Sequence, residues 1–320
     1  MFLPILLTIV GLSLILVGAN YLTDGAVAIA KKLKISEMII GLTIVAIGTS
    51  MPEFIVSVVS SAEGAYDISV GNVVGSNIFN ILVILGVVAL IKPISLSKEN
   101  VNRDMLLCVL SSLVLWASCS TMLLDGAPIN TVTRSNGVIM LALFIGFMYI
   151  MIRSGRAEGK EQSNKPTSTP QPTWLALIML VGGFGGLIYG GELFIDNITT
   201  IARMMNISES VISITIVAAG TSLPELATSV VAMIKGKNDI ALGNVIGSNI
   251  SNVFLVLGAS ATIHPLTLSG IDQIDLGMVT FSTVLILISA WLFGRNRIDR
   301  VEGAFFLMCY IGYMAWLLVK

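Results

Sequence analysis

Two glutamates in strongly apolar surroundings have the clearest capacity for chemistry in this sequence. Glu53 and Glu225 each follow a proline, Pro52 and Pro224, within otherwise apolar stretches. A carboxylate inside an apolar membrane helix is costly unless it is satisfied, so it indicates a functional site. Proline removes a backbone N–H and disturbs the helix just upstream, which frees carbonyl oxygens to line a cavity. Carboxylates beside freed carbonyls predict a cation site.

A threonine stands four residues before each glutamate. Thr49 precedes Glu53, and Thr221 precedes Glu225, at the spacing that places two side chains on one face of a helix. Hydroxyls, carbonyls and two carboxylates form a set of oxygen ligands, which suits hard cations, and calcium accepts such irregular sets. One Ca²⁺ or two monovalent cations would neutralise the two carboxylates. Without a cation, their repulsion favours protonation of one carboxylate.

The surroundings of the two glutamates repeat each other at a shift of 172 residues (225 − 53). Residues 48–53 match residues 220–225, with Gly-Thr-Ser-x-Pro-Glu in both copies. Residues 71–78 match residues 243–250, with Gly-Asn-Val-x-Gly-Ser-Asn-Ile in both copies. We interpret this register, which has no gap, as an internal duplication.

Composition indicates that these elements lie in a membrane. Hydrophobic residues make up 55% of the 320 residues and charged residues only 12%, with a mean hydropathy of +0.92. An ordinary soluble domain is about a quarter charged. The net charge of −1 offers no basic face for nucleic acid. His264 is the only histidine, which excludes histidine-based metal or triad chemistry, and the three cysteines are interpreted as core residues.

Apolar stretches long enough to cross a bilayer predict an all-α integral membrane protein with ten transmembrane helices. A polar, proline-containing linker at residues 154–173 separates a first five-helix repeat, residues 1–153, from a second, residues 174–320. The expected helix cores are residues 3–29, 37–61, 68–91, 104–124, 133–152, 174–202, 209–234, 240–263, 274–294 and 301–319. Five helices per half is an odd number, so the second repeat is expected to be inverted, which favours a carrier over a channel.

Positive charge predicts the orientation. Fifteen of the 18 Lys and Arg residues fall in the linker or in loops on its side of the membrane. The positive-inside rule therefore places the linker in the cytoplasm and both termini outside the cell. We expect a multi-pass protein of the plasma membrane.

Further polar residues follow in the third and eighth predicted helices. Ser76 and Asn80 share a face of one helix, as Ser248 and Asn252 do in the other, and could add neutral oxygens. The amides of Asn77 and Asn249 are expected to bond neighbouring backbone instead of a cation. The glycine-rich run at residues 182–191 could serve close helix packing or a sliding contact, and the two readings stay open.

The paired Gly-Thr-Ser-x-Pro-Glu motifs, each followed by Gly-Asn-x-x-Gly-Ser-Asn, resemble the two alpha repeats of the calcium/cation antiporter superfamily. The resemblance covers the whole chain, and its nearest branch is the prokaryotic sodium/calcium exchangers. It implies a core of helices 2, 3, 7 and 8 that holds the ions, crossed by sliding helices 1 and 6. It also implies several Na⁺ coupled to one Ca²⁺, hence sensitivity to membrane potential.

Carried over position by position, the resemblance implies metal ligands from both repeats. The first repeat would supply Ala46, Thr49, Ser50, Glu53, Ser76 and Asn80, and the second would supply Ala218, Thr221, Ser222, Glu225, Ser248 and Asn252. Proton/calcium exchangers of the superfamily usually carry Asn where Thr49 and Thr221 stand, so threonine favours sodium. Potassium-dependent members carry Asp at the position of Asn252, so the neutral residue disfavours potassium.

The expected function is secondary active exchange of Na⁺ for Ca²⁺, with a proton/calcium antiporter of the same superfamily as the alternative. A calcium channel is disfavoured by the inverted repeats and by the lack of a selectivity-filter loop. An enzyme is not expected, because the membrane helices show no aspartyl-protease motif, Ser/Lys dyad or histidine-metal set. We expect Ca²⁺, Na⁺ and membrane lipid as partners, no cofactor and no nucleic acid, and a monomer.

Overall fold

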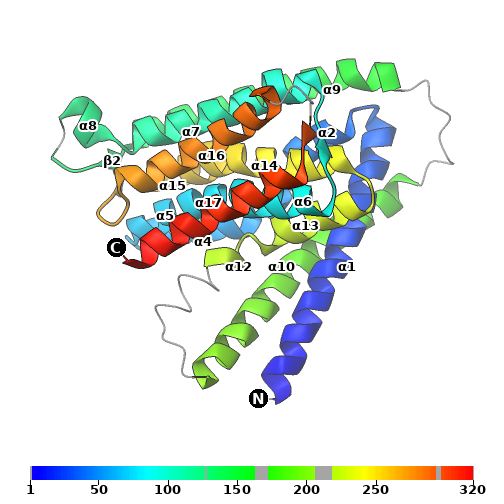
Figure 1. Ribbon diagram of the computed structural model, residues 1–320, viewed down its shortest axis with the longest axis horizontal. Helices are drawn as coiled ribbons and strands as arrows, with labels where there is room; N and C mark the ends of the chain where they lie inside the picture. The colour runs from blue at the N-terminus through cyan, green and yellow to red at the C-terminus, as the bar shows by residue number, and fades with distance from the viewer. Residues whose placement is uncertain (1, 127, 163–171, 206–217, 293–296, 320) are drawn as a thin grey trace. The chain divides into compact units, whose positions relative to one another are not determined.

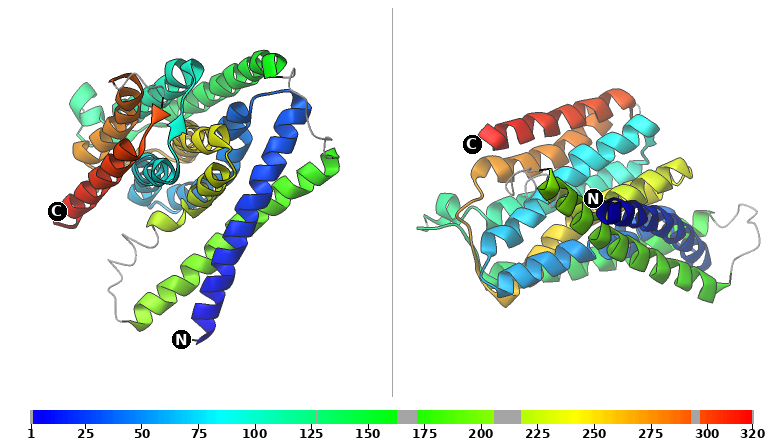
Figure 2. Two further views of the ribbon diagram at one scale, coloured as in Figure 1. Left: turned by 45° about the vertical axis from the view of Figure 1, so that its right-hand side comes forward. Right: turned by 90° about the horizontal axis from the view of Figure 1, so that it is seen from below.

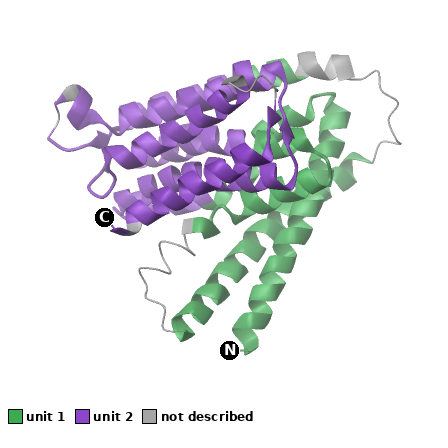
Figure 3. Ribbon diagram, in the orientation of Figure 1, with its two compact units in different colours: residues 1–52, 150–244 green, residues 53–149, 245–320 purple. Residues whose placement is uncertain are grey.

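The computed structural model describes residues 2–126, 128–162, 172–205, 218–292 and 297–319. These residues divide into two compact units, coloured separately in Figure 3. Unit 1 consists of Met1–Pro52 and Ile150–Asn244, and unit 2 consists of Glu53–Tyr149 and Val245–Lys320. Each unit therefore takes segments from both halves of the sequence.

Unit 1 is built around two long helices that lie side by side, α1 (Phe2–Leu33) and α10 (Thr173–Met204) (Figure 1). Its other elements are short and follow one another closely along the chain. They are α2 (Glu37–Ile40), the π-helix η1 (Gly41–Val45), α3 (Ala46–Thr49), α12 (Ala218–Gly220), α13 (Leu223–Ile234) and the first half of α14 (Asn238–Ser251).

Glycines allow the backbones of α1 and α10 to approach each other closely. The two helices lie side by side in both views of Figure 2. Gly11, Gly18 and Gly25 recur every seven residues on α1. A Cβ at Gly18 would lie 2.8 Å from the carbonyl oxygen of Gly183, and one at Gly190 would lie 2.9 Å from that of Gly11. The glycine-rich run of α10 therefore serves packing, and its sliding role stays a prediction.

Unit 2 is a helical bundle closed by two short strand pairs. Its helices are α4 (Met51–Ala62), α5 (Tyr66–Phe79), η2 (Asn80–Leu85), α6 (Gly86–Ile91), η3 (Asn100–Met105), α7 (Leu106–Ser118), α8 (Thr121–Asp125), α9 (Arg134–Gln162) as far as Tyr149, the second half of α14, η5 (Asn252–Leu257), α15 (Gly258–Ile263), α16 (Gln273–Leu292) and α17 (Arg300–Val319). The strand β1 (Ile94–Ser95) pairs antiparallel with β4 (Arg297–Ile298), and β2 (Thr131–Val132) pairs antiparallel with β3 (Leu266–Thr267).

The duplication seen in the sequence is reproduced in the bounds of the elements. α4 and α13, α5 and α14, η2 and η5, α6 and α15, and β1 and β3 begin and end at the same shift of 172 residues. Two π-helices are part of this pattern, since η2 begins at Asn80 and η5 at Asn252, whereas the π-helix η3 corresponds to the start of the α-helix α16. Inserted π-turns recur at functional sites. Matching sequence has therefore imposed matching backbone, including its irregular parts.

Each glutamate motif interrupts its helix, as the prolines predict. α3 ends at Thr49, Ser50 has φ −80° and ψ 9°, and the helix resumes as α4 with a bend of 47°. Ser222 has nearly the same conformation, φ −89° and ψ 8°, before α13. Pro52 has no N–H to offer the carbonyl of Gly48, so the helix yields two residues before the proline.

Seven helices of the described residues are long and apolar enough to cross a membrane, or eight if the bent pair Glu37–Thr49 and Met51–Ala62 is one span. Helical elements fall within each of the ten predicted ranges, apart from residues 209–217, which lie outside the described residues. The number of ten crossings and the inversion of the repeats stay predictions, as does the division into two repeats and a linker.

Two helix ends differ from the expected ranges. The helix expected over residues 104–124 ends at Ser118, and the short helix α8 follows it. Between them, Ser120 is outside a helical conformation, because its hydroxyl is hydrogen-bonded to the side-chain amide of Gln273 over 3.1–3.2 Å. α9 continues to Gln162, into the segment expected as linker, where Ala157, Glu158 and Lys160 favour helix.

Candidate ion-binding site

Glu53 lies in the first turn of α4 in unit 2 and is fully buried. Its Oε1 accepts a hydrogen bond from the Ser76 hydroxyl on α5 over 3.4 Å. Its backbone carbonyl accepts a second bond, from the amide of Asn72, over 3.1 Å. Ser76 is also buried. Unit 2 therefore brings together Glu53 and Ser76, two of the residues that the resemblance implies as ligands.

Glu225 has the corresponding position in unit 1, in the first turn of α13, and it is equally buried. Its Oε1 accepts a hydrogen bond from the Ser50 hydroxyl over 2.9 Å. Its backbone carbonyl accepts from the amide of Asn244 over 3.2 Å. Ser50 belongs to the break in the first repeat, so unit 1 joins the glutamate of one repeat to the broken helix of the other.

Thr49 is buried beside the same break. Its hydroxyl donates to the Oδ1 of Asn244 over 3.0 Å and lies 3.3 Å from the carbonyl oxygen of Ala46. The expected cluster of Ala46, Thr49 and Ser50 is thus one turn of helix and its end. In the second repeat, Ser222 is buried in the matching break.

Two further expected ligands sit beside Ser222 in sequence. Thr221 is partly buried, and Ala218 is the first residue of α12.

The asparagines that open the two π-helices are buried and incompletely satisfied. Neither side-chain atom of Asn80 has a hydrogen-bond partner. Asn252 donates through Nδ2 to the Oδ1 of Asn77 over 3.1 Å, whereas its own Oδ1 has no partner. Buried polar groups in folded proteins are almost always hydrogen-bonded, so such atoms call for a bound ion or water. Ser248, the remaining expected ligand, is buried on α14.

Asn77 and Asn249 bond backbone, as expected from the sequence. The Nδ2 of Asn77 donates to the carbonyl of Asn249 over 3.3 Å, and the Nδ2 of Asn249 donates to that of Asn77 over 3.1 Å. This reciprocal pair fixes the crossing of α5 and α14 within unit 2, at the level from which η2 and η5 begin.

Asn72 and Asn244 are residues to which the sequence analysis gave no role in the site. Each amide also bonds the serine four residues after its glutamate, over 2.9 Å to Ser57 and 3.0 Å to Ser229. A signal was present, because both the asparagines and the serines recur at the shift of 172 residues. Their partners lie 15 and 19 residues away in sequence, and helical spacing alone does not connect them.

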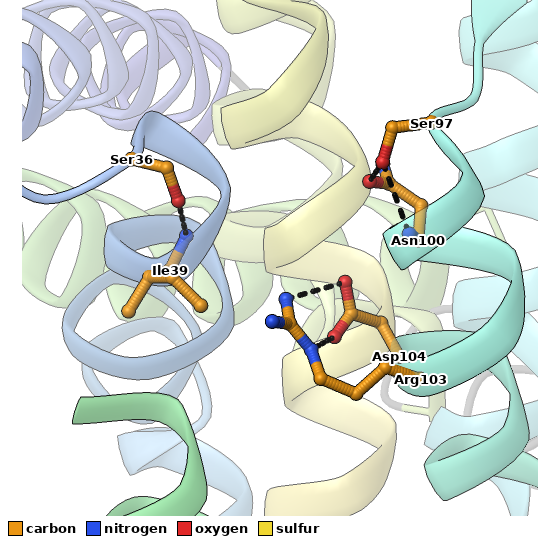
Figure 4. A network of polar contacts seen from close by, with 6 residues as sticks. All are labelled: Ser36, Ile39, Ser97, Asn100, Arg103 and Asp104. Carbon is orange, nitrogen blue, oxygen red and sulfur yellow. Dashed lines mark hydrogen bonds and ion pairs between the residues drawn. The ribbon is translucent and has the colours of Figure 1, made fainter. Parts of the chain in front are cut away.

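Figure 4 shows polar contacts outside this site, some within unit 1 and others within unit 2. In η3 the guanidinium of Arg103 holds the buried carboxylate of Asp104, with Nε 2.6 Å from Oδ1. Ser97 bonds Asn100 ahead of that helix, and in unit 1 the hydroxyl of Ser36 caps α2. These bonds satisfy helix starts and a buried charge, which is a structural task.

The chemistry available around each glutamate is that of oxygen. Carboxylate, hydroxyl, amide and carbonyl oxygens surround the two helix breaks, and within the described ranges no group of three His, Cys, Asp or Glu side chains could hold a metal ion. Oxygen ligands of this kind suit Ca²⁺, Na⁺ and similar hard cations. Glu53 and Glu225 are therefore both buried carboxylates set among neutral oxygen atoms.

Comparisons with known proteins agree on one family. The sequence model of the family described as sodium/calcium exchanger protein matches residues 3–153 and 175–319. "Putative antiporter CaxA" of Alkalimonas amylolytica is 39% identical over 317 residues, 95% of each chain. Sodium/calcium exchanger MaX1 of Methanosarcina acetivorans is 32% identical, with 97% of each chain covered. A solved structure of the sodium-calcium exchanger NCX_Mj superimposes with a TM-score of 0.83 and 31% identity over 99% of both chains.

Proposed function

The chain belongs to the sodium/calcium exchanger protein family, which is a family of membrane transporters, and from this premise we propose that it exchanges Na⁺ for Ca²⁺. Exchange would be secondary active transport by alternating access, with the ions as substrates and no cofactor. We further propose that Glu53 and Glu225 bind one common set of ions.

One observation carries this proposal: each repeat buries a single glutamate in the first turn of a helix that resumes after a break. Two buried carboxylates are costly in a medium of low dielectric constant unless a cation or a proton neutralises them. A cation that binds both would remove this cost, and its departure would restore it. Protein without bound ions would therefore switch between the two states of alternating access less readily than protein with bound ions.

The remaining proposed ligands are neutral oxygens. They are Thr49, Thr221, Ser50, Ser222, Ser76, Ser248, Asn80 and Asn252, together with the backbone of Ala46 and Ala218. Asn80 supports this set, since its buried Oδ1 lacks a protein partner. Neutral Asn252 and the two threonines support sodium over potassium or protons as the coupling ion, on the family resemblance.

The arrangement in the membrane is proposed from sequence. Ten crossings in two inverted repeats would put both termini outside the cell and the linker in the cytoplasm of a plasma-membrane protein. The positive-inside pattern supports this orientation. Cysteine labelling from outside intact cells would check it, because a Glu63→Cys variant should be labelled and a Lys92→Cys variant should not.

Radioactive calcium uptake into sodium-loaded proteoliposomes tests the function. Dilution into sodium-free buffer should drive uptake, dilution into sodium-matched buffer should not, and Glu53→Gln should abolish the sodium-driven part. Uptake that ignores sodium but follows an imposed pH gradient would move the protein to the proton-coupled alternative. Flux that needs no counter-ion and does not saturate would indicate a channel.

A further inference from the structure

Asn244 holds three elements of unit 1 together through a single amide. Its Nδ2 donates to the carbonyl of Glu225 over 3.2 Å and to the hydroxyl of Ser229 over 3.0 Å, both on α13. Its Oδ1 accepts from the hydroxyl of Thr49 over 3.0 Å, at the end of α3. The residue is fully buried on α14, so no solvent competes for these bonds.

The carbonyl oxygen of Glu225 determines which group donates in each of these hydrogen bonds. The carbonyl oxygen of Glu225 can only accept, so the amide of Asn244 must turn its N–H₂ group toward that oxygen. Its Oδ1 must then face Thr49, and the hydroxyl of Thr49 must donate. The other protein partner of that hydroxyl is the carbonyl oxygen of Ala46, 3.3 Å away, which also only accepts.

Thr49 has one hydroxyl proton, and both of its partners require it. The lone pairs of the hydroxyl oxygen therefore receive no hydrogen from these two partners. We propose that Asn244 is a positioning residue that orients the Thr49 hydroxyl so that its oxygen lone pairs stay available to a bound cation. A free hydroxyl would rotate and could turn its proton toward the ion, which weakens binding.

The first repeat shows that the orientation of this amide is not accidental. The Nδ2 of Asn72 donates to the carbonyl of Glu53 over 3.1 Å and to the hydroxyl of Ser57 over 2.9 Å. In both repeats a glutamate carbonyl thus fixes which way the asparagine amide points. This inference rests on the proposed function, because it assigns Asn244 a task at the same ion site.

A double-mutant cycle between Asn244 and Thr49 tests the inference. Asn244→Leu removes the amide at similar volume, and Thr49→Val removes the hydroxyl at similar shape. The apparent KM for Ca²⁺ and the maximal rate are measured in proteoliposomes under a fixed sodium gradient. Ser112→Ala is the matched control, because it removes another buried hydroxyl, which bonds Thr283 over 2.8 Å in unit 2.

Asn244→Leu should raise the KM about tenfold in the wild-type background, and by no more than about threefold when Thr49 is already Val. The maximal rate should fall by less than the KM rises, and Ser112→Ala should leave the KM within about twofold of wild type. If Asn244→Leu does not yield folded protein, Asn244→Ala removes the same bonds and the same ratio is expected.

Equal KM increases in both backgrounds, in protein that stays monodisperse, would overturn the positioning role and leave the proposed function intact. A wild-type protein without sodium-driven calcium uptake would overturn the proposed function, and the inference with it. The two failures are therefore separate results of one set of measurements.

Discussion

The duplicated sequence builds one region alike in both copies and a neighbouring region differently. Beside the glutamates, Asn72 and Asn244 donate to the glutamate carbonyls over 3.1 and 3.2 Å. At the starts of the two π-helices the copies differ. Asn252 donates to the side chain of Asn77, whereas the matching amide of Asn80 has no hydrogen-bond partner.

The asparagine beside the glutamate therefore makes the same hydrogen bond in both repeats, whereas the asparagine at the start of the π-helix does not. In both repeats the glutamate carbonyl lies in the first turn of a helix, where a backbone N–H can bond it, and the same asparagine supplies an additional donor. At the start of each π-helix the side chains differ: Asn252 has a partner for its Nδ2 but none for its Oδ1, and Asn80 has none for either atom. A buried amide without a partner costs about 1–3 kcal/mol, which a bound ion or water would recover.

The largest effect is expected from removal of the carboxylate charge that both repeats have in common. Glu53→Gln and Glu225→Gln should each reduce sodium-driven calcium uptake about 100-fold or more, because a neutral amide cannot offset the charge of Ca²⁺. Both variants should fold, since glutamine keeps an acceptor oxygen for the serine hydroxyl. Exposed Glu63→Gln is the control. Wild-type uptake in one variant would show that the two repeats are not equivalent at the site.

A smaller effect should separate the two π-helix asparagines. Asn252→Leu leaves the Oδ1 of Asn77 without its donor, so the free energy of unfolding should fall by about 1–3 kcal/mol. Asn80→Leu breaks no protein hydrogen bond, so stability should stay the same or rise by a similar amount.

Thermal unfolding of purified protein without Na⁺ and Ca²⁺ measures this difference. Addition of either ion should stabilise wild-type protein and should stabilise the Asn80→Leu protein less. Equal losses of stability in both variants would contradict the asymmetry between the copies.

The smallest effect should be somewhat larger in the first repeat, because the Ser57 hydroxyl also donates to the carbonyl of Ser69 over 3.2 Å. Ser57→Ala and Ser229→Ala each remove an acceptor of the asparagine amide, and each should lower the unfolding free energy by about 0.5–1.5 kcal/mol. Exposed Ser13→Ala, which loses only a bond within its own helix, is the comparison. A larger loss at Ser229 than at Ser57 would show that the matching hydrogen bonds do not have matching energies.

Several features of the fold could be predicted because they depend on neighbours in sequence. Pro52 and Pro224 predict the helix breaks, which fall two residues earlier at Ser50 and Ser222. The shift of 172 residues predicts matching elements in the two halves. For Asn77 the sequence predicts only a bond to backbone, because the carbonyl that its amide bonds, that of Asn249, lies 172 residues away.

Other features depend on partners that no local pattern identifies. The role of Asn244 requires Thr49, which lies 195 residues away in sequence. The π-helices that begin at Asn80 and Asn252 leave the apolar periodicity nearly unchanged, so the sequence there predicts an ordinary α-helix. The break at Ser120 arises from its bonds to Gln273, more than a hundred residues later.

By itself the sequence determined the membrane environment, the duplication, the pair of buried glutamates and the oxygen chemistry around them. These depend on composition and on short spacings, which act before the chain folds. Only the tertiary structure decided which polar group donates a hydrogen bond to which acceptor. A hydrogen bond acts over about 3 Å, so its partners are known only once distant segments are brought together.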